Sequence, residues 1–299
     1  MQQYLPEGLM LHSAEQLPRY SQPELDRAQQ EGTILEAIVT MCDAQHNLVV
    51  NLGSTTGLIP YEETAIGVAE GAVRDVAILS RVGRPVCFQV TNAAANPVLL
   101  SRRAAQLQAR DALFAQRHTG DILPAIVTNP TRFGAFCDIG CGLVGLLGIE
   151  NISVSRIHHS QERLREGQQI FVILQSLDPD TGRVTLSHKE LLGTWAQNAA
   201  AFQAGQTVTG IVRSKKDYGL FIELAPNLSG LAEPRADLDE GDAVSVYIKA
   251  ILPQKQKIKL IVLKKLERAL LSQPPVEYFE VGEHLSSWQY SPASALTLF

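Results

Sequence analysis

The chain has 299 residues, of which 45% are hydrophobic and 19% charged, and its formal net charge is −5. This length allows two or three domains, and the apolar content predicts that most of the chain folds. Apolar runs stay well below the roughly 20 residues of a membrane-spanning helix, and the first residues show no signal-peptide pattern. Four cysteines are too few to crosslink so long a chain. We therefore expect a cytoplasmic protein with reduced thiols and no membrane contact.

Residues 1–30 are expected to form a partly helical leader. Ser21 stands before Pro23 and Glu24, a spacing typical of a helix N-cap with an acid at the third helical position. The leader therefore predicts a helix that begins directly after Ser21.

Short strands are predicted for the next segment, residues 31–104. Its central stretch alternates with period 2, so Leu48, Val50 and Leu52 would face a core while Val49 faces outward. The segment 105–117 is rich in Ala, Gln, Leu and Arg and has no Gly or Pro. It is predicted to be a helical linker.

The segment 118–190 contains the most informative stretch, which runs from Arg132 to Gly140. Ala135, Cys137 and Ile139 would point into a core, whereas Phe136 and Asp138 would point to the wet side. A large apolar ring on a polar strand face needs a partner, and nucleic-acid bases are the usual flat partners of such rings.

The pattern returns in the segment 205–268, beyond a second predicted helical linker at 191–204. There Leu220, Ile222 and Leu224 would face inward, and Phe221 and Glu223 outward. Tyr218 takes the place of the first ring, at an offset of 85 residues from Phe133. Two strands with aromatic-Gly-x-Phe predict two stacking platforms.

Internal repetition decides the architecture. Residues 31–104 form a fainter copy of 118–190 and 205–268, and each copy reads as about five short strands. A small closed antiparallel barrel fits such a unit, because closure removes exposed strand edges. The tail, residues 269–299, is rich in aromatic residues and is expected to pack on one of the barrels.

The pattern Gly-x-x-x-x-Gly-x-Val, Phe/Tyr-Gly-x-Phe, Gly-Leu and Arg-Val-x-Leu-Ser-x-Lys resembles the S1 RNA-binding domain. It is clear over 118–190, good over 205–265 and weak over 31–104. The three-repeat layout is similar to that of short ribosomal protein S1 homologues of clostridial-type bacteria. The resemblance implies a mainly β protein, with three tandem five-stranded OB-fold barrels of S1 type joined by short helices.

The same resemblance implies binding of single-stranded RNA such as mRNA, with the small ribosomal subunit as a further partner and no cofactor. The family uses two aromatics, a histidine, an aspartate and an arginine on one barrel face. In the second repeat the matching residues are Phe133, Phe136, Asp178 and Arg183, with Gly148 at the histidine position. In the third they are Tyr218, Phe221 and Lys257, with Glu233 and Leu252 at the histidine and aspartate positions. Arg132, Lys215 and Lys216 are expected to contact phosphate.

The first repeat keeps the barrel core but loses this face, since His46 and Val49 replace the rings and Pro97 takes the arginine position. Residues 1–116 are also net −4, whereas 205–268 are net +3. We therefore expect residues 1–116 to serve as a docking or spacing domain.

Each feature also has a plainer interpretation. A neighbouring barrel could cover the aromatic rings. The alternating lysines Lys255, Lys257 and Lys259 could form a solvated strand face, with phosphate contact as the rival interpretation. Cys137 and Cys141 have a C-x3-C spacing, but alternation places Cys137 in a core, so no metal is expected. Phosphate-binding, nucleophile-elbow and zinc-protease motifs do not occur, so we do not expect an enzyme. The rival hypothesis is a protein-interaction scaffold that docks on the ribosome or on an RNA-processing enzyme.

Overall fold

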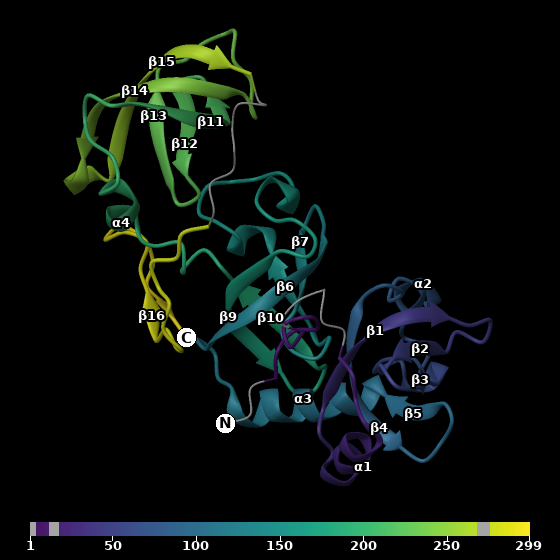
Figure 1. Cartoon of the computed structure of the whole chain (residues 1–299). Helices are drawn as coiled ribbons and strands as arrows, with labels where there is room; N and C mark the ends of the chain where they lie inside the picture. Colours follow the sequence, from purple (N-terminus) through teal and green to yellow (C-terminus); the bar gives the residue numbers. More distant parts are fainter. Residues whose placement is uncertain (1–3, 12–17, 268–275) are drawn as a thin grey trace.

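The computed structural model describes residues 4–11, 18–267 and 276–299. It contains three closed five-stranded barrels in chain order, followed by a two-stranded tail (Figure 1). The mainly β architecture of three tandem S1-type barrels is therefore confirmed. In the part of the chain that the structure describes, no helix is both long and apolar enough to cross a membrane.

Barrel 1 comprises five strands and is preceded by helix α1, Gln22–Glu31. Its strands are β1 Leu35–Cys42, β2 Leu48–Asn51, β3 Thr56–Ile59, β4 Pro85–Asn92 and β5 Val98–Ser101, with η1 Tyr61–Glu63 and α2 Asp75–Leu79 between β3 and β4. The predicted helix start is confirmed, because the Ser21 backbone N–H donates to the Glu24 carboxylate at 2.7 Å. Helix α3, Arg102–Gln116, leads to the next barrel.

Barrels 2 and 3 repeat the plan. Barrel 2 has β6 Ile122–Pro130, β7 Gly134–Asp138, β8 Val144–Gly148, η2 Ile149–Asn151, η3 Ser160–Glu162, β9 Gln169–Asp178 and β10 Arg183–Ser187. Barrel 3 has β11 Thr207–Lys216, β12 Gly219–Ala225, β13 Leu228–Ala232, β14 Ala243–Leu252, η4 Pro253–Lys255 and β15 Lys257–Leu266. The expected second linker helix is short, since α4 covers only Trp195–Ala199. The tail strands are β16 Ser287–Trp288 and β17 Thr297–Leu298.

Strand order is the same in all three barrels, with the fifth strand inserted between the third and the fourth. Four pairings in each barrel are antiparallel, and the pairing of third with fifth strand is parallel. Alternation fills each barrel as expected. Leu48, Val50, Ala135, Cys137 and Ile222 are fully buried.

Two outward carboxylates do not face solvent, and here the sequence-based prediction is wrong. Asp138 and Glu223 are 4% and 6% exposed. Alternation correctly points them away from their own barrel, but a neighbouring element covers each one. Asp138 accepts a hydrogen bond from the Glu7 backbone N–H at 2.8 Å, and Glu223 binds Arg213 and Arg163.

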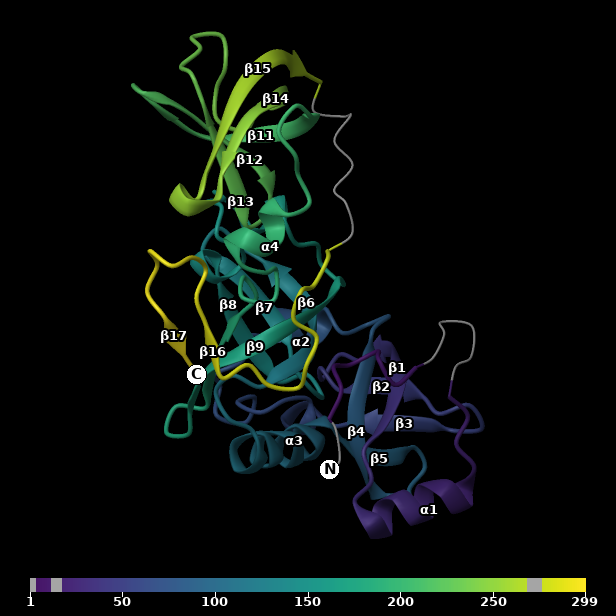
Figure 2. The same cartoon turned by 90° about the vertical axis from the view of Figure 1, so that its left-hand side faces the viewer.

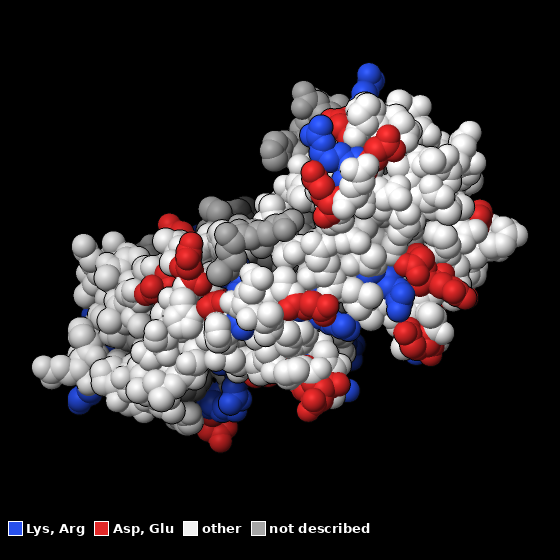
Figure 3. Space-filling view, turned by 90° about the horizontal axis from the view of Figure 1, so that it is seen from below, with Lys and Arg blue, Asp and Glu red and all other residues white. Residues whose placement is uncertain are grey.

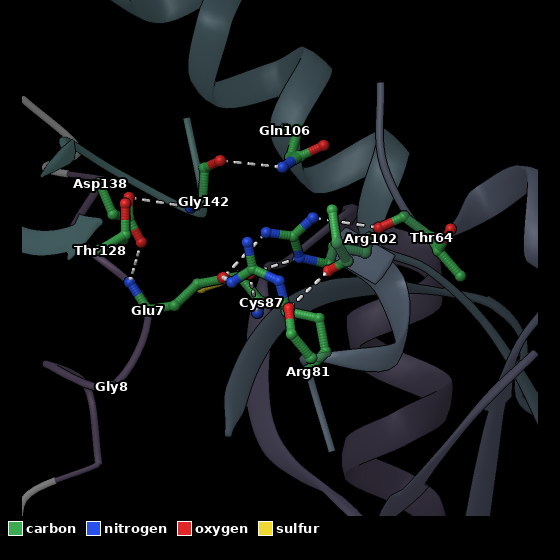
Figure 4. Close-up of polar contacts among 12 residues, drawn as sticks. Glu7, Gly8, Thr64, Arg81, Cys87, Arg102, Gln106, Thr128, Asp138 and Gly142 are labelled. Atoms are coloured by element: carbon green, nitrogen blue, oxygen red, sulfur yellow. Dashed lines mark hydrogen bonds and ion pairs between the residues drawn. The ribbon is translucent and has the colours of Figure 1, made fainter. Parts of the chain in front are cut away.

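The joint between barrels 1 and 2 is a buried ionic network (Figure 4). Glu7 accepts from Arg102 Nε at 2.6 Å and Nη2 at 2.9 Å, and also from Arg81 at 3.2 Å. Burial alone would raise the pKa of Glu7, but the charge and hydrogen bonds of Arg102 outweigh that effect and lower it. Gly142 is required here, because a Cβ would lie 2.0 Å from Arg102 Nη2. The network therefore fixes leader, α3 and barrel 2 together.

The joint between barrels 2 and 3 uses the equivalent strand position. Arg213 on β11 binds Glu223 with Nε at 2.7 Å and also pairs with Glu162 of barrel 2. Arg163 of barrel 2 pairs with the same Glu223. Asn227 adds a neutral contact, since its side chain accepts from Val154 N at 2.9 Å. Charged groups from both barrels therefore neutralise one another at this joint.

The tail packs on barrel 2, beside β9 (Figure 2). The Tyr278 hydroxyl accepts from Phe171 N at 3.1 Å and lies 3.3 Å from His188 Nε2. His188 is buried, and its Nδ1–H donates to Ile152 O at 3.0 Å. Burial lowers the pKa of His188 to about 4, so the ring is neutral and its Nε2 can accept from Tyr278.

We predict that this histidine makes stability depend on pH. In the unfolded chain His188 binds a proton below about pH 6.5, whereas in the fold it does so only near pH 4. Neutral His188 therefore contributes its full share to the free energy of unfolding above about pH 6.5. That share falls by ~3 kcal/mol as the pH drops toward 4. The measurement is the free energy of unfolding of barrel 2 from denaturant curves at pH 7 and pH 5.

His188→Asn is the matched control, because an amide keeps a donor toward Ile152 but does not titrate. Burial raises the pKa of Asp138 to about 7, so its protonation stabilises the fold as the pH falls, opposite to His188. This effect is the same in the wild type and in His188→Asn. An equal pH slope in wild type and variant would contradict a neutral buried His188.

Candidate nucleic-acid interface

The first aromatic pair lies on the outer face of barrel 2. Phe133 is 57% exposed and precedes β7, and Phe136 on β7 is half-buried. Their ring centroids are 5.9 Å apart at 82°, edge to face. Gly134 between them has φ of +151°, and a Cβ there would lie 2.3 Å from Leu147 O. The glycine thus lets β7 approach β8 so closely that both rings stand on one surface.

Barrel 3 reproduces this geometry. Tyr218 is 66% exposed, and its centroid lies 6.1 Å from that of Phe221 at 87°. Gly219 has φ of +157°, and a Cβ there would lie 2.5 Å from Ala232 O. Within the described residues, Phe133 and Tyr218 keep more than half of their surface exposed, so both faces are open to a flat ligand.

In both barrels, strand pairing places further side chains in a row beside the second aromatic ring. In barrel 2 Phe136 pairs with Leu146, and Leu146 pairs with Thr185 of β10. In barrel 3 the same row runs from Phe221 through Leu231 to Lys259. Sequence analysis did not assign Leu146, Thr185 or Leu231 to the site, because the parallel pairing that aligns them is visible only in the assembled barrel. Lys259 had been weighed both as part of a solvated strand face and as a phosphate contact.

Asp178 and Arg183 face each other across the β9–β10 hairpin. The Asp178 carboxylate accepts from Thr181 Oγ1 at 2.6 Å and from Thr181 N at 3.2 Å. The hydrogen bond from the Thr181 side chain lowers the pKa of Asp178. Asp178 therefore stays ionised and holds the turn, while Arg183 is exposed beside the ring platform.

The predicted phosphate-contacting residues differ in whether other groups of the protein already bind their charged ends. Lys215 Nζ already donates to Leu238 O at 2.7 Å and lies 3.5 Å from Asp239. Arg132, Lys216 and Lys257 are exposed. Lys257 stands at the start of β15 opposite Leu252. These three cations are therefore better placed than Lys215 to meet a phosphate.

Barrel 1 lacks an open platform. Val49 is half-buried at the position of Phe136. His46, at the position of Phe133, lies 5.9 Å from the ring of Tyr61 and 3.6 Å from Asp75. These contacts turn the histidine toward its own barrel. On the face shown in Figure 3, basic and acidic side chains are interspersed and not segregated by sign.

Metal ligation has no support within residues 4–11, 18–267 and 276–299, where no group of three or more His, Cys, Asp or Glu side chains could hold an ion. Cys137 is fully buried in the barrel 2 core. Cys141 lies in a separate cluster with Cys87, between barrels 1 and 2. The C-x3-C spacing therefore reflects packing.

Comparison with known proteins gives matches of three kinds. Residues 117–189 match the family model of the S1 RNA binding domain. The chain is 30% identical over 253 residues to small ribosomal subunit protein bS1 of Leuconostoc lactis, which covers 79% of this chain and 57% of that protein. It is 29% identical over 259 residues to the bS1 protein of Staphylococcus aureus (strain COL), which covers 81% of this chain and 63% of that protein.

Among solved structures, a multidomain protein with nucleic acid binding domains from Streptococcus pneumoniae matches at 13% identity and a TM-score of 0.27. The match covers 77% of this chain and 73% of that one. The TM-score is too low for the arrangement of domains to be compared. The chain thus spans 57% and 63% of the length of the two curated relatives that it matches. Residues 117–189 thus match the S1 RNA binding domain family, and most of the chain is similar to bS1 proteins.

Proposed function

We propose that the chain binds single-stranded RNA through the aromatic faces of barrels 2 and 3. It would act in translation, on mRNA and at the small ribosomal subunit, in the bacterial cytoplasm. The observation that carries the proposal is the repeated open pair of rings, Phe133 with Phe136 and Tyr218 with Phe221. An exposed aromatic pair accepts any base, because every base has a π face. The curated relatives are ribosomal proteins of the small subunit, which supports the proposed setting.

The charges beside the rings fit the same ligand. Arg183 and Arg132 adjoin the barrel 2 platform, and Lys216, Lys257 and Lys259 adjoin that of barrel 3. Cations of this kind neutralise phosphates without reading sequence. We therefore propose a binding protein without catalytic function, in which bases stack on the rings and the cations hold the backbone.

A protein-interaction scaffold, docked on the ribosome or on an RNA-processing enzyme, is the second candidate. It is favoured by the outer surface of β14 and β15, where Tyr247, Ile261 and Leu263 are 37%, 44% and 52% exposed. Tyr247 and Ile261 are cross-strand partners, so their side chains form one apolar patch. Exposed apolar patches commonly mark protein contacts.

Phe133→Ala tests the stacking platform. We expect a loss of roughly 1–3 kcal/mol in binding of a single-stranded oligoribonucleotide, the usual worth of one stacked base. The melting temperature should barely change, because the ring is 57% exposed. Fluorescence anisotropy with a labelled oligonucleotide measures the first quantity, and thermal unfolding measures the second.

Phe171→Ala is the control for that variant, since Phe171 is 44% exposed on the same barrel but contacts Tyr278 of the tail. Its replacement should leave RNA affinity unchanged. Equal affinity losses in the two variants, or no loss in either, would reject the platform.

The lysines of barrel 3 should differ in their salt dependence. Lys216→Gln should flatten the slope of log affinity against log salt concentration by about 0.7, the contribution of one phosphate contact on a single strand. Lys215→Gln should flatten it less, because that ammonium group is held by Leu238 O and Asp239. Titrations at several salt concentrations measure both slopes. A larger effect for Lys215 than for Lys216 would contradict this assignment.

A further inference from the structure

A cavity of about 370 Å³ lies between barrel 1 and barrel 2. Ligand pockets generally have volumes of about 300–1,000 Å³, so it is large enough for one nucleotide. Arg81, Arg102 and Arg110 line it, and no aspartate or glutamate does so among the described residues. Its apolar wall is formed by α2 and by α3, for example by Ala77 and Phe114.

The positive charge around this cavity is only partly balanced, because Arg110 has Asp111 as a partner at 3.3 Å, whereas Arg81 and Arg102 share Glu7. Each of the three nitrogens of Arg102 makes one hydrogen bond, Nε and Nη2 to Glu7 and Nη1 to Thr64 O. Within the described residues, the side chain of Arg81 makes one hydrogen bond, to the same Glu7. Glu7 thus faces two guanidinium groups. Asp138, the next carboxylate, has a pKa that burial raises to about 7, so it offsets the excess only in part at neutral pH.

The cavity also continues the ring-bearing face of barrel 2. Thr185 lies beside Leu146 across the parallel pair, and Arg183 lies two residues before Thr185 on β10. Val144 lies opposite Asp138, which is two residues beyond Phe136 on β7. Side chains two residues apart share a strand face, so Val144 and Arg183 are on the same surface as Phe136. Val144 is 50% exposed and lines the cavity. The cavity is also lined by Thr181 and Gly182, the tip of the hairpin between Asp178 and Arg183.

We propose that this cavity is a further RNA subsite, in which barrel 1 and α3 bind the nucleotide that follows the stretch stacked on Phe133 and Phe136. Arg81 and Arg110 would hold its phosphate, and the apolar wall would take its base. The inference rests on the proposed RNA binding by barrel 2. It replaces the expectation that residues 1–116 only dock or space, because the first repeat and α3 together supply most of the cavity wall.

Binding of a labelled 12-nucleotide oligouridylate to the full chain tests the subsite. We expect Arg110→Gln to weaken binding by about three- to tenfold, the effect of one partly exposed cation on a phosphate. Arg103→Gln is the matched control, because Arg103 lies on the same helix and is 35% exposed against 39% for Arg110. Each has one carboxylate partner, Glu63 and Asp111 respectively, but Arg103 does not line the cavity. It should leave the affinity unchanged.

A variant that fills the cavity tests the same subsite without removing a charge. Ala77 lines the cavity from α2 and is exposed, so Ala77→Trp should occupy the base position with little effect on melting temperature. We expect it to weaken binding to a similar extent. A 4-thiouridine oligonucleotide should also crosslink to residues 73–81 or 106–114 in the wild type, and less so in this variant.

Failure of the inference is distinguishable from failure of the proposed function. If Phe136→Ala weakens binding but Arg110→Gln and Ala77→Trp behave like Arg103→Gln, only the subsite is overturned. If Phe136→Ala has no effect, the platform itself is wrong. If uridine monophosphate binds in an Arg110-dependent way while the oligonucleotide is unaffected, the cavity takes free nucleotide, and the continuous path is overturned.

Discussion

The pairing of Glu7 with Arg102 is the interaction on which the arrangement of the first two barrels depends. Both side chains are withdrawn from water, so each charge is tolerable only in the presence of the other. Loss of one partner from such a pair commonly costs about 3–5 kcal/mol, because the other charge remains buried and unpaired. Glu7 comes from the leader, Arg102 from the start of α3, and the Glu7 backbone N–H binds Asp138 of barrel 2. One carboxylate therefore fixes three elements, and with them the cavity beside the ring platform.

Each barrel is joined to the preceding segment at the same strand position. Asp138 and Glu223 are equivalent at an offset of 85 residues, and both are covered. Asn51 holds this position in barrel 1, where it accepts from Gly53 N at 2.8 Å and the leader residue Tyr20 bridges to Gly53. Phe136 and Phe221 lie two residues earlier on the same face, about 7 Å away along the strand. One outer face thus forms a joint at one end and, in the proposed function, binds RNA at the other, which would explain why it carries both aromatic and acidic residues.

Period-2 alternation was sufficient to predict the barrel interiors, because a five-stranded barrel has one inside whatever lies around it. It could not predict the exposure of Asp138 or Glu223, since that depends on elements far away in sequence: Glu7 lies 131 residues from Asp138, and Arg163 lies 60 residues from Glu223. The rows of side chains through Leu146 and Leu231 could not be predicted from the sequence, for a related reason. They need the parallel register between third and fifth strands, which local pattern does not specify. The aromatic pairs were predictable because aromatic, glycine and phenylalanine sit within four residues.

A chain with net charge −5 can still present cations to RNA, because its arginines and lysines are used differently. Arg102, Arg163 and Arg213 are buried in the joints, where a planar guanidinium can bind a carboxylate through two or more donors at once. Lys216, Lys257 and Lys259 stay exposed beside the rings, where a flexible, hydrated ammonium can follow a mobile phosphate backbone. Acids such as Glu7 and Glu223 are neutralised inside the protein and repel a strand little. The local charge of an exposed face, and not the sum over the chain, therefore decides whether RNA is attracted.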